Sequence, residues 1–293
     1  MTPAALPSVE RETFQGLPCL RLGLPCGDAV RVALHGAHVL SWVAGGRERL
    51  YLSPNALLDG QSAIRGGVPV CFPQFNQRGP LPKHGFVRNL PWTAAPIVEP
   101  VSGNTAGLAA DAAQLSLHLR DSDATRALWP QAFDATLSLQ LQPGSLQLTL
   151  TVRNTDQQPL HFTGALHTYL AVDDIGAVQL DGLQGLPRWD AVADVHGQDA
   201  GTLTFHTEFD RVYTASAAAL TLREGPGRLR IAQSESLAHT VVWNPGAALC
   251  ARLPDMPADG FAQMLCVEAA QVLAPVEVAS GHTWQGWQRL TVL

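Results

Sequence analysis

The segment from Leu137 to Val152, LSLQLQPGSLQLTLTV, decides the fold class. Leucines alternate with serine, glutamine or threonine on both sides of a turn at Pro143-Gly144. Strict alternation is typical of a β-strand with one buried face, because successive side chains of a strand point to opposite faces. Two such runs joined by a Pro-Gly turn predict an antiparallel hairpin.

Working outward from this hairpin, similar short alternating runs recur along the chain. They lie at Cys19–Leu24, Ala29–Leu34, Gln114–Leu119, Ala219–Arg223, Arg228–Ala232 and Thr240–Trp243. Helical periodicity is nearly absent, and only Ala124–Trp129 predicts a short helical turn. Many strands without intervening helices favour an all-β sandwich or barrel over a parallel α/β sheet. No charged or Gly/Ser-rich linker divides the chain, so we expect one domain over residues 1–293.

Composition excludes several classes of protein. The chain is 46% hydrophobic and 15% charged, which allows a large core and argues against disorder. The net charge of −6, without a cluster of basic residues, argues against a nucleic-acid binder. The sequence holds no apolar run of about 18 residues and no basic start followed by an apolar stretch. We therefore expect no membrane span, no signal peptide and a cytoplasmic protein.

Cysteine and histidine spacing gives little support for a metal site or a disulfide framework. The five cysteines are scattered and contain no CxxC pair. His35 and His38 are three residues apart, a spacing that does not place them on one face of a strand. The common nucleotide-binding, zinc-protease and serine-hydrolase motifs are also absent.

Candidate functional residues stand out where polar groups interrupt apolar stretches. His167 lies within ALHTYLAV, and Glu268 follows the apolar run of MLCVEA. A buried imidazole or carboxylate is costly unless it is paired or put to use, so both are candidates for a site. Arg65 precedes two glycines, which permit unusual backbone angles and the close approach of a ligand.

Taken together, these segments resemble the aldose 1-epimerase (mutarotase) superfamily, and in particular its glucose-6-phosphate 1-epimerase branch. The resemblance rests on seven signatures in family order: IRGGVPVCFPQF, PKHGFVRNLPW, LWPQAF, LHTYLAVDDI, FDRVY, VVWNPG and MLCVEAA. They extend from about residue 50 to about residue 270. The fold that the resemblance implies is a large antiparallel β-supersandwich of the galactose mutarotase type, in agreement with the strand pattern.

The resemblance also implies roles for individual residues. The histidine of LHTY and the glutamate of CVE, here His167 and Glu268, act as general acid and general base in that branch. His84, in the HGF segment, is then a second imidazole that lines the sugar site. Arg65 and Arg88 are the pair expected to bind the 6-phosphate.

Two aspartates complete the implied site. Asp210, in FDRVY, is expected to hold sugar hydroxyls, and Asp255 is given a weaker role in positioning its loop. A net charge of −6 does not exclude a dianionic ligand, because two arginines can bind a phosphate through charge-assisted hydrogen bonds.

The implied reaction is the interconversion of the α and β anomers of a hexose 6-phosphate by ring opening and reclosure. One group takes the proton of the C1 hydroxyl while another protonates the ring oxygen, which requires an acid and a base and no cofactor or metal. The expected partner is therefore a small phosphorylated hexose, and we expect a monomer.

Three alternatives remain at the level of the sequence. If Arg65 and Arg88 are ordinary surface or strand arginines, a free aldose 1-epimerase is favoured. A non-catalytic sugar-binding module could instead use Trp243, Trp284 and Trp287 as stacking platforms. A cupin-like metal enzyme would need several histidines and a carboxylate that converge on a metal ion.

Overall fold

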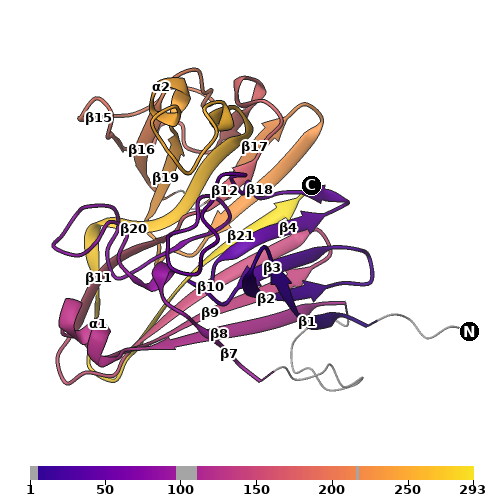
Figure 1. The fold of residues 1–293 in the computed structure, drawn as a ribbon. Coiled ribbons are helices and arrows are strands. Elements are labelled where there is room, and N and C mark those ends of the chain that lie inside the picture. Colours follow the sequence, from indigo (N-terminus) through magenta and orange to yellow (C-terminus); the bar gives the residue numbers. More distant parts are fainter. Residues whose placement is uncertain (1–5, 97–110, 216–217) are drawn as a thin grey trace, which may run out of the picture.

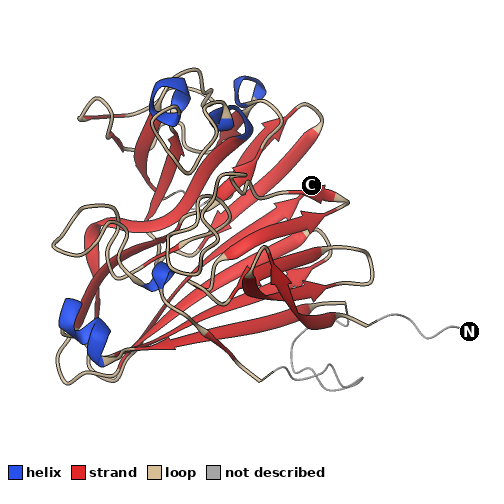
Figure 2. Ribbon diagram, in the orientation of Figure 1, coloured by secondary structure: helices blue, strands red, loops and turns tan. Residues whose placement is uncertain are grey.

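The structure, a computed structural model, describes residues 6–96, 111–215 and 218–293. Strands dominate it and the helices are short (Figure 2). The helices are α1 (Asp123–Leu128), α2 (Gly246–Cys250) and the 3-10 helices η1 (Val87–Asn89), η2 (Ile175–Ala177) and η3 (Gly260–Gln263). None of the helices in these ranges has the length and apolar character needed to span a membrane.

The described strands form three sheets (Figure 1). The N-terminal sheet contains, in spatial order, β1 (Ser8–Phe14), β2 (Leu17–Gly23), β3 (Ala29–Ala33), β4 (Val39–Ala44) and β5 (Arg47–Glu48). The central sheet has the order β13 (Gln179–Asp181), β17 (Leu220–Glu224), β18 (Gly227–Gln233), β21 (Thr283–Val292), β10 (Ser145–Asn154), β9 (Phe133–Gln142), β8 (Ala113–Arg120) and β7 (Thr93–Ala94).

The third sheet carries most of the candidate functional residues. Its order is β15 (Val195–Gly197), β14 (Arg188–Asp190), β16 (Phe209–Thr214), β19 (His239–Asn244), β20 (Met264–Val278), β11 (Leu160–Leu166) and β6 (Val70–Cys71), with β12 (Tyr169–Ala171) also paired to β20. The named strands pair in antiparallel fashion in all three sheets. The prediction of an all-β, antiparallel sandwich is confirmed.

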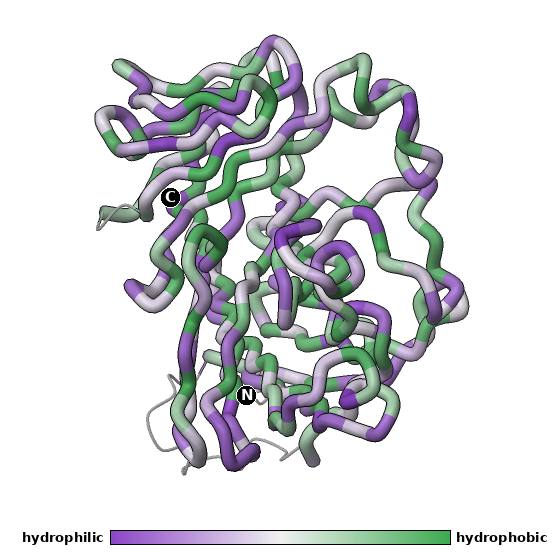
Figure 3. Tube along the Cα trace, turned by 90° about the vertical axis from the view of Figure 1, so that its left-hand side faces the viewer, coloured by the Kyte–Doolittle hydropathy of each residue, from purple (hydrophilic) through white to green (hydrophobic). Residues whose placement is uncertain are grey.

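The hairpin predicted from Leu137 to Val152 is present as β9 and β10. Its two strands pair in a continuous register from Ser145 with Gln142 to Asn154 with Phe133. Their leucines are buried and the intervening polar residues are partly exposed. The six other predicted runs fall on β2, β3, β8, β17, β18 and β19, and the predicted helical turn is α1. Figure 3 shows hydrophobic and hydrophilic residues alternating along many extended segments of the chain.

One large core connects the three sheets. It includes Leu20 and Leu22 of β2, Leu139 of β9, and Leu265 and Val267 of β20. Burying this much apolar surface supplies the main driving force for folding. Because β20 contributes Leu265 and Val267 to the core, the residues that alternate with them point to its other face. That second face of β20 carries the candidate site.

Candidate active site

Strand register places several site residues on one face of the third sheet. Asp210 of β16 lies opposite Trp243 of β19, and Trp243 lies opposite Cys266 of β20. Cys266 in turn lies opposite Tyr169 of β12. Residues directly opposite each other in paired strands share a face, so these four side chains form a row across the sheet. Glu268 is two residues beyond Cys266 and therefore points to the same face.

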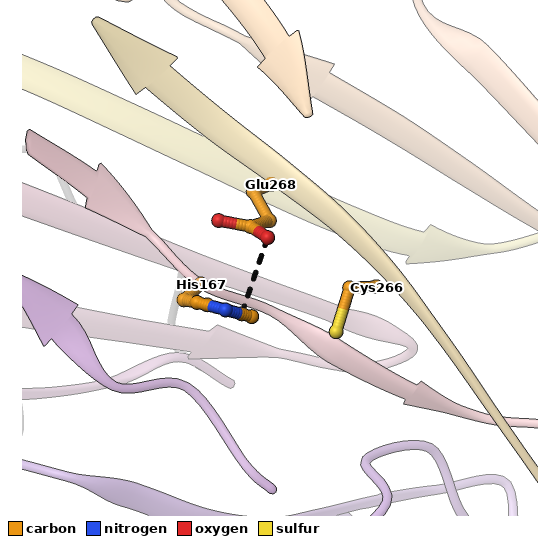
Figure 4. Close-up of side chains that lie close together, drawn as sticks. All are labelled: His167, Cys266 and Glu268. Atoms are coloured by element: carbon orange, nitrogen blue, oxygen red, sulfur yellow. Dashed lines mark ion pairs between the residues drawn. The ribbon is translucent and has the colours of Figure 1, made fainter. Parts of the chain in front are cut away.

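His167 and Glu268, the predicted acid and base, lie next to each other (Figure 4). The imidazole Nδ1 is 3.3 Å from Oε1 of the carboxyl group. Both residues are buried, with exposed fractions of 8% for His167 and 1% for Glu268. Among the described residues, neither Nδ1 of His167 nor Oε2 of Glu268 has a hydrogen-bond partner. Buried polar atoms without partners are costly, so this pair is better explained by contact with a ligand than by stability.

Burial changes the pKa values of the two groups in opposite directions. Loss of hydration raises the pKa of Glu268 well above its ordinary value, and the nearby Asp210 carboxylate adds to the effect. Loss of hydration also lowers the pKa of His167 well below its ordinary value, helped by His84, Arg65 and Arg88. The two shifts favour a neutral imidazole and a protonated carboxyl group in the ligand-free protein.

His84 lies beside His167. The two ring centroids are 5.3 Å apart, and the rings meet edge to face. The backbone N–H of Asn76 donates to Nδ1 of His84 over 3.2 Å, which leaves Nε2 as the protonated nitrogen of the neutral ring. Burial and the charges of Arg88, Lys83 and Arg65 lower the pKa of His84 to about 3. His84 is therefore a neutral hydrogen-bond donor at neutral pH.

Arg65 is held at the site by two partners. Its Nε donates to Oδ2 of Asp255 over 3.1 Å, and its Nη1 donates to the Tyr169 hydroxyl over 3.1 Å. Its guanidinium carbon is 6.0 Å from the centre of the Trp243 ring. The predicted loop-positioning residue Asp255 is therefore the ion-pair partner of Arg65.

The two glycines after Arg65 are required by the backbone conformation of this segment. Gly66 and Gly67 have φ angles of 107° and 60°, a region that side-chain-bearing residues rarely adopt. A Cβ at Gly66 would lie 2.4 Å from the carbonyl oxygen of Tyr51, so the close approach expected here involves the protein's own backbone. His38 donates from Nε2 to the Gly66 carbonyl over 2.7 Å and supports the same loop.

Arg88 and Lys83 add positive charge beside the imidazoles. Arg88 lies in η1 and donates from Nη2 to the Lys83 carbonyl over 2.8 Å. Within the part of the chain that the structure describes, no carboxylate lies at ion-pair distance from either side chain. Partial burial and the repulsion of Arg65 and Arg88 lower the pKa of Lys83. Three cations that repel one another at close range are typical of a site that binds an anion.

Asp210 is close enough to Glu268 to influence its ionisation. Burial and the neighbouring Glu208 raise the pKa of Asp210 to about 6, while Lys83 acts in the opposite direction. A partly buried carboxylate on the same face of the sheet as Glu268 can accept hydrogen bonds from hydroxyl groups. All six residues assigned from the sequence are thus brought to one region of the molecule.

The tryptophans proposed as stacking platforms are separated by the fold. Trp243 belongs to the site, with its ring 6.3 Å from the His167 ring and nearly perpendicular to it. Trp284 packs edge to face on Phe162, and Trp287 lies under the guanidinium of Arg289. Among these three, Trp243 is the tryptophan that the structure places at the candidate site.

Three residues of the site were not identified by sequence reasoning. Tyr169 stacks on His167 with ring centroids 4.8 Å apart and an interplanar angle of 8°. Lys83 and Cys266 are the other two. Tyr169 follows His167 by two residues and Cys266 precedes Glu268 by two, so period-2 spacing from the predicted acid and base could have indicated both.

This arrangement defines a class of protein: an antiparallel β-sandwich with a buried acid–base pair beside a cationic cluster, suited to proton transfer on an anionic substrate. The chain belongs to the aldose 1-epimerase family, whose model, Aldose 1-epimerase, matches residues 18–291.

Individual relatives agree with this assignment. The chain is 38% identical over 245 residues to an Escherichia coli (strain K12) protein named "Putative glucose-6-phosphate 1-epimerase", covering 81% of this chain and 78% of that one. A Cenchrus ciliaris protein of the same name is 34% identical over 262 residues, covering 87% of this chain and 78% of the relative. The crystal structure of "a putative mutarotase (YeaD)" from Salmonella typhimurium superimposes with a TM-score of 0.84 at 30% identity, covering 97% of this chain and 93% of that one.

Proposed function

We propose that this chain is a hexose-6-phosphate 1-epimerase that interconverts α- and β-glucose 6-phosphate. The observation that carries the proposal is the buried His167–Glu268 pair beside a cluster of cations. In this pair Nδ1 of the imidazole and Oε1 of the carboxyl group are 3.3 Å apart. The names of the relatives, which specify glucose 6-phosphate, support the same substrate.

Epimerisation needs one proton donor and one proton acceptor at the hemiacetal. The acceptor takes the C1 hydroxyl proton as the donor protonates the ring oxygen, and the ring opens to an aldehyde. Rotation about C1–C2 presents the other carbonyl face, and the reverse transfers close the ring as the opposite anomer. Positioned acid–base groups typically contribute about 10²–10⁴ in rate each. His167 and Glu268 can supply one donor and one acceptor and can exchange these roles.

The substrate itself would help to set the protonation state. Arg65 and Arg88 contribute to the low pKa of His167 in the ligand-free protein. A bound phosphate dianion would offset both positive charges and raise the pKa of the imidazole. A protonated His167 is the acid that the family resemblance implies.

The other residues would orient the sugar. Arg88 and Lys83, which lack carboxylate partners among the described residues, are best suited to bind the phosphate directly. Arg65 would add a further donor while it stays fixed by Asp255 and Tyr169. Nε2–H of His84 and the Asp210 carboxylate supply a donor and an acceptor for ring hydroxyls.

Anomeric exchange measured by NMR tests the proposal directly. Saturation transfer between the α and β H1 signals is recorded after the protein is added to glucose 6-phosphate and, separately, to glucose. We expect fast exchange with the phosphate ester and much slower exchange with glucose. Exchange with glucose alone would keep the acid–base pair but reject the phosphate site. Silence with both sugars would reject the enzyme and favour a binding module.

A further inference from the structure

A third potential metal ligand lies beside the acid–base pair. His167, Cys266 and Glu268 each offer one ligand atom, and these atoms all lie within 4.8 Å of one another. Figure 4 shows the Cys266 thiol and the Glu268 carboxyl group extending from the same strand toward the His167 side. The cluster is built into the sheet, because residues two apart on β20 share a face and His167 lies between β11 and β12, which both pair with β20.

The ligand atoms of this cluster are buried and largely unused. His167 is 8% exposed, Cys266 0% and Glu268 1%. Nδ1 of His167 and Oε2 of Glu268 have no hydrogen-bond partner among the described residues. The imidazole Nδ1 and the carboxyl Oε2 of two buried side chains thus lie close together without hydrogen bonds among the described residues. An ion that coordinated them would remove the cost of leaving them unsatisfied.

The chemistry of the three ligands selects the kind of ion. Mg²⁺ and Ca²⁺ prefer sets made of oxygen atoms, whereas one sulfur, one imidazole nitrogen and one carboxylate oxygen suit Zn²⁺. With Zn²⁺ bonds of about 2.0–2.3 Å, tetrahedral ligands lie about 3.5 Å apart. Nδ1 and Oε1 are already 3.3 Å apart, and the three ligand atoms lie within 4.8 Å of one another, so the sulfur must move closer to complete the tetrahedral spacing.

We infer that His167, Cys266 and Glu268 form an inhibitory Zn²⁺ site, in which the ion occupies the position of the reacting sugar atoms and excludes the substrate. This role differs from that of a catalytic metal, because the ion blocks the two groups that transfer protons. The inhibitory effect rests on the proposed epimerase function. The binding of the ion does not, since it depends only on the three ligands.

Two measurements test this site separately. Cd²⁺, which prefers the same ligands, reports the thiolate through its charge-transfer absorption in the ultraviolet, without any need for activity. Zn²⁺ is titrated into the NMR exchange assay after the full-length protein has been treated with a chelator. The variants are Cys266→Ser, which removes the sulfur ligand with little change in volume, and Cys26→Ser, a control at an exposed free cysteine.

We expect the Cd²⁺ band in the wild type and in Cys26→Ser, and its loss in Cys266→Ser and in Glu268→Gln. Zn²⁺ should raise the apparent KM of the wild type, and excess chelator should restore the rate. In Cys266→Ser the Zn²⁺ inhibition, measured against that variant's own rate without Zn²⁺, should be at least tenfold weaker. A wild type without the band, or a Cys266→Ser variant with the full band or undiminished inhibition, would overturn the site. A normal band in a protein that epimerises neither sugar would reject the proposed function and leave the metal site standing.

Discussion

The hairpin β9–β10 and the strand β20 show two different relations between burial and sequence. In β9 and β10 buried and partly exposed residues alternate from end to end, and the register is continuous. In β20 the first seven residues, Met264–Ala270, are all buried, and its pairing with β11 shifts between Phe162 and Gly164. The strand pair β9–β10 faces water on one side, whereas this part of β20 is buried on both sides.

This difference indicates that the hairpin serves mainly stability and that the site face of β20 serves function. The polar residues of the hairpin keep access to water and cost little, while its leucines fill the core. Glu268 sits on a fully buried stretch of β20, where a carboxyl group is expensive and gains no hydrogen bond for Oε2 from the described residues. Substitutions in the hairpin should therefore reduce stability and leave catalysis intact, and substitutions at the polar positions of the β20 face should do the reverse.

The largest effect is expected from Glu268→Gln. Glutamine keeps the shape of the side chain but cannot exchange a proton, so turnover of glucose 6-phosphate should fall at least about a hundredfold, or about 2.7 kcal/mol in activation free energy. Saturation-transfer NMR gives the rate, and near-normal turnover would remove Glu268 from proton transfer.

The Glu268→Gln variant should be at least as stable as the wild type, and the difference in unfolding free energy between the two should depend on pH. Burial raises the pKa of Glu268 in the folded protein, so above the ordinary carboxyl pKa the unfolded chain has released a proton that the folded chain keeps. The free energy of unfolding that this group contributes therefore falls as pH rises. Urea titrations between pH 5 and 8 should show the unfolding free energy of Glu268→Gln rising relative to that of the wild type as pH increases. A stability difference that shrinks with increasing pH would contradict the raised pKa of Glu268.

Leu139→Ala tests the other side of the comparison. Leu139 is fully buried in the main core, so its truncation should cost about 2–5 kcal/mol of unfolding free energy. The rate per folded molecule should stay the same. Its neighbour Gln140 faces the opposite side of β9, and Gln140→Ala should change stability by less than about 0.5 kcal/mol. Equal losses in the two variants would mean that the hairpin is buried on both faces.

The contrast between one-sided and two-sided burial also explains which parts of the structure could be predicted from the sequence. The hairpin and the six shorter runs were predictable because one-sided burial leaves a period of two, and α1 was predicted from the helical periodicity of its segment. The order of the strands in three sheets was not predictable from spacing, since the pairing of distant strands such as β10 with β21 depends on packing across the whole core.

The candidate site was predictable only in part. The resemblance to a family indicated His167, Glu268 and the two arginines, whereas physics alone marked them merely as polar interruptions of apolar runs. The neutral state of the acid–base pair could not be predicted, because it depends on burial from both sides of β20. Lys83 was missed for a related reason: a single lysine in a loop carries no signal until the fold places it near Arg65 and Arg88.

Arg88→Ala should separate phosphate binding from proton transfer within the candidate site. Loss of charge-assisted hydrogen bonds worth about 1.5–3 kcal/mol should raise KM for glucose 6-phosphate about 10- to 150-fold, with a much smaller effect on glucose. Arg120→Ala, at an exposed arginine of β8, is the control and should change neither. Equal losses on the two sugars in Arg88→Ala would reject its role in phosphate binding.

The smallest effect is expected from Tyr169→Phe, which tests whether the β20 face also positions its cations. Phenylalanine keeps the stack on His167 but removes the hydroxyl that accepts from Nη1 of Arg65. One hydrogen bond is worth about 0.5–1.5 kcal/mol, so KM for glucose 6-phosphate should rise about 2- to 12-fold while kcat changes little.

Asp255→Asn removes the charge of the other partner of Arg65 and should give the same pattern, because both changes act on one guanidinium. In the double variant the losses should be non-additive, since Arg65 is already released by either change alone. If kcat falls in Tyr169→Phe and KM stays constant, the hydroxyl acts on the acid–base pair instead. Tyr169 would then position the catalytic imidazole, and the division between phosphate binding and proton transfer on this face would not hold.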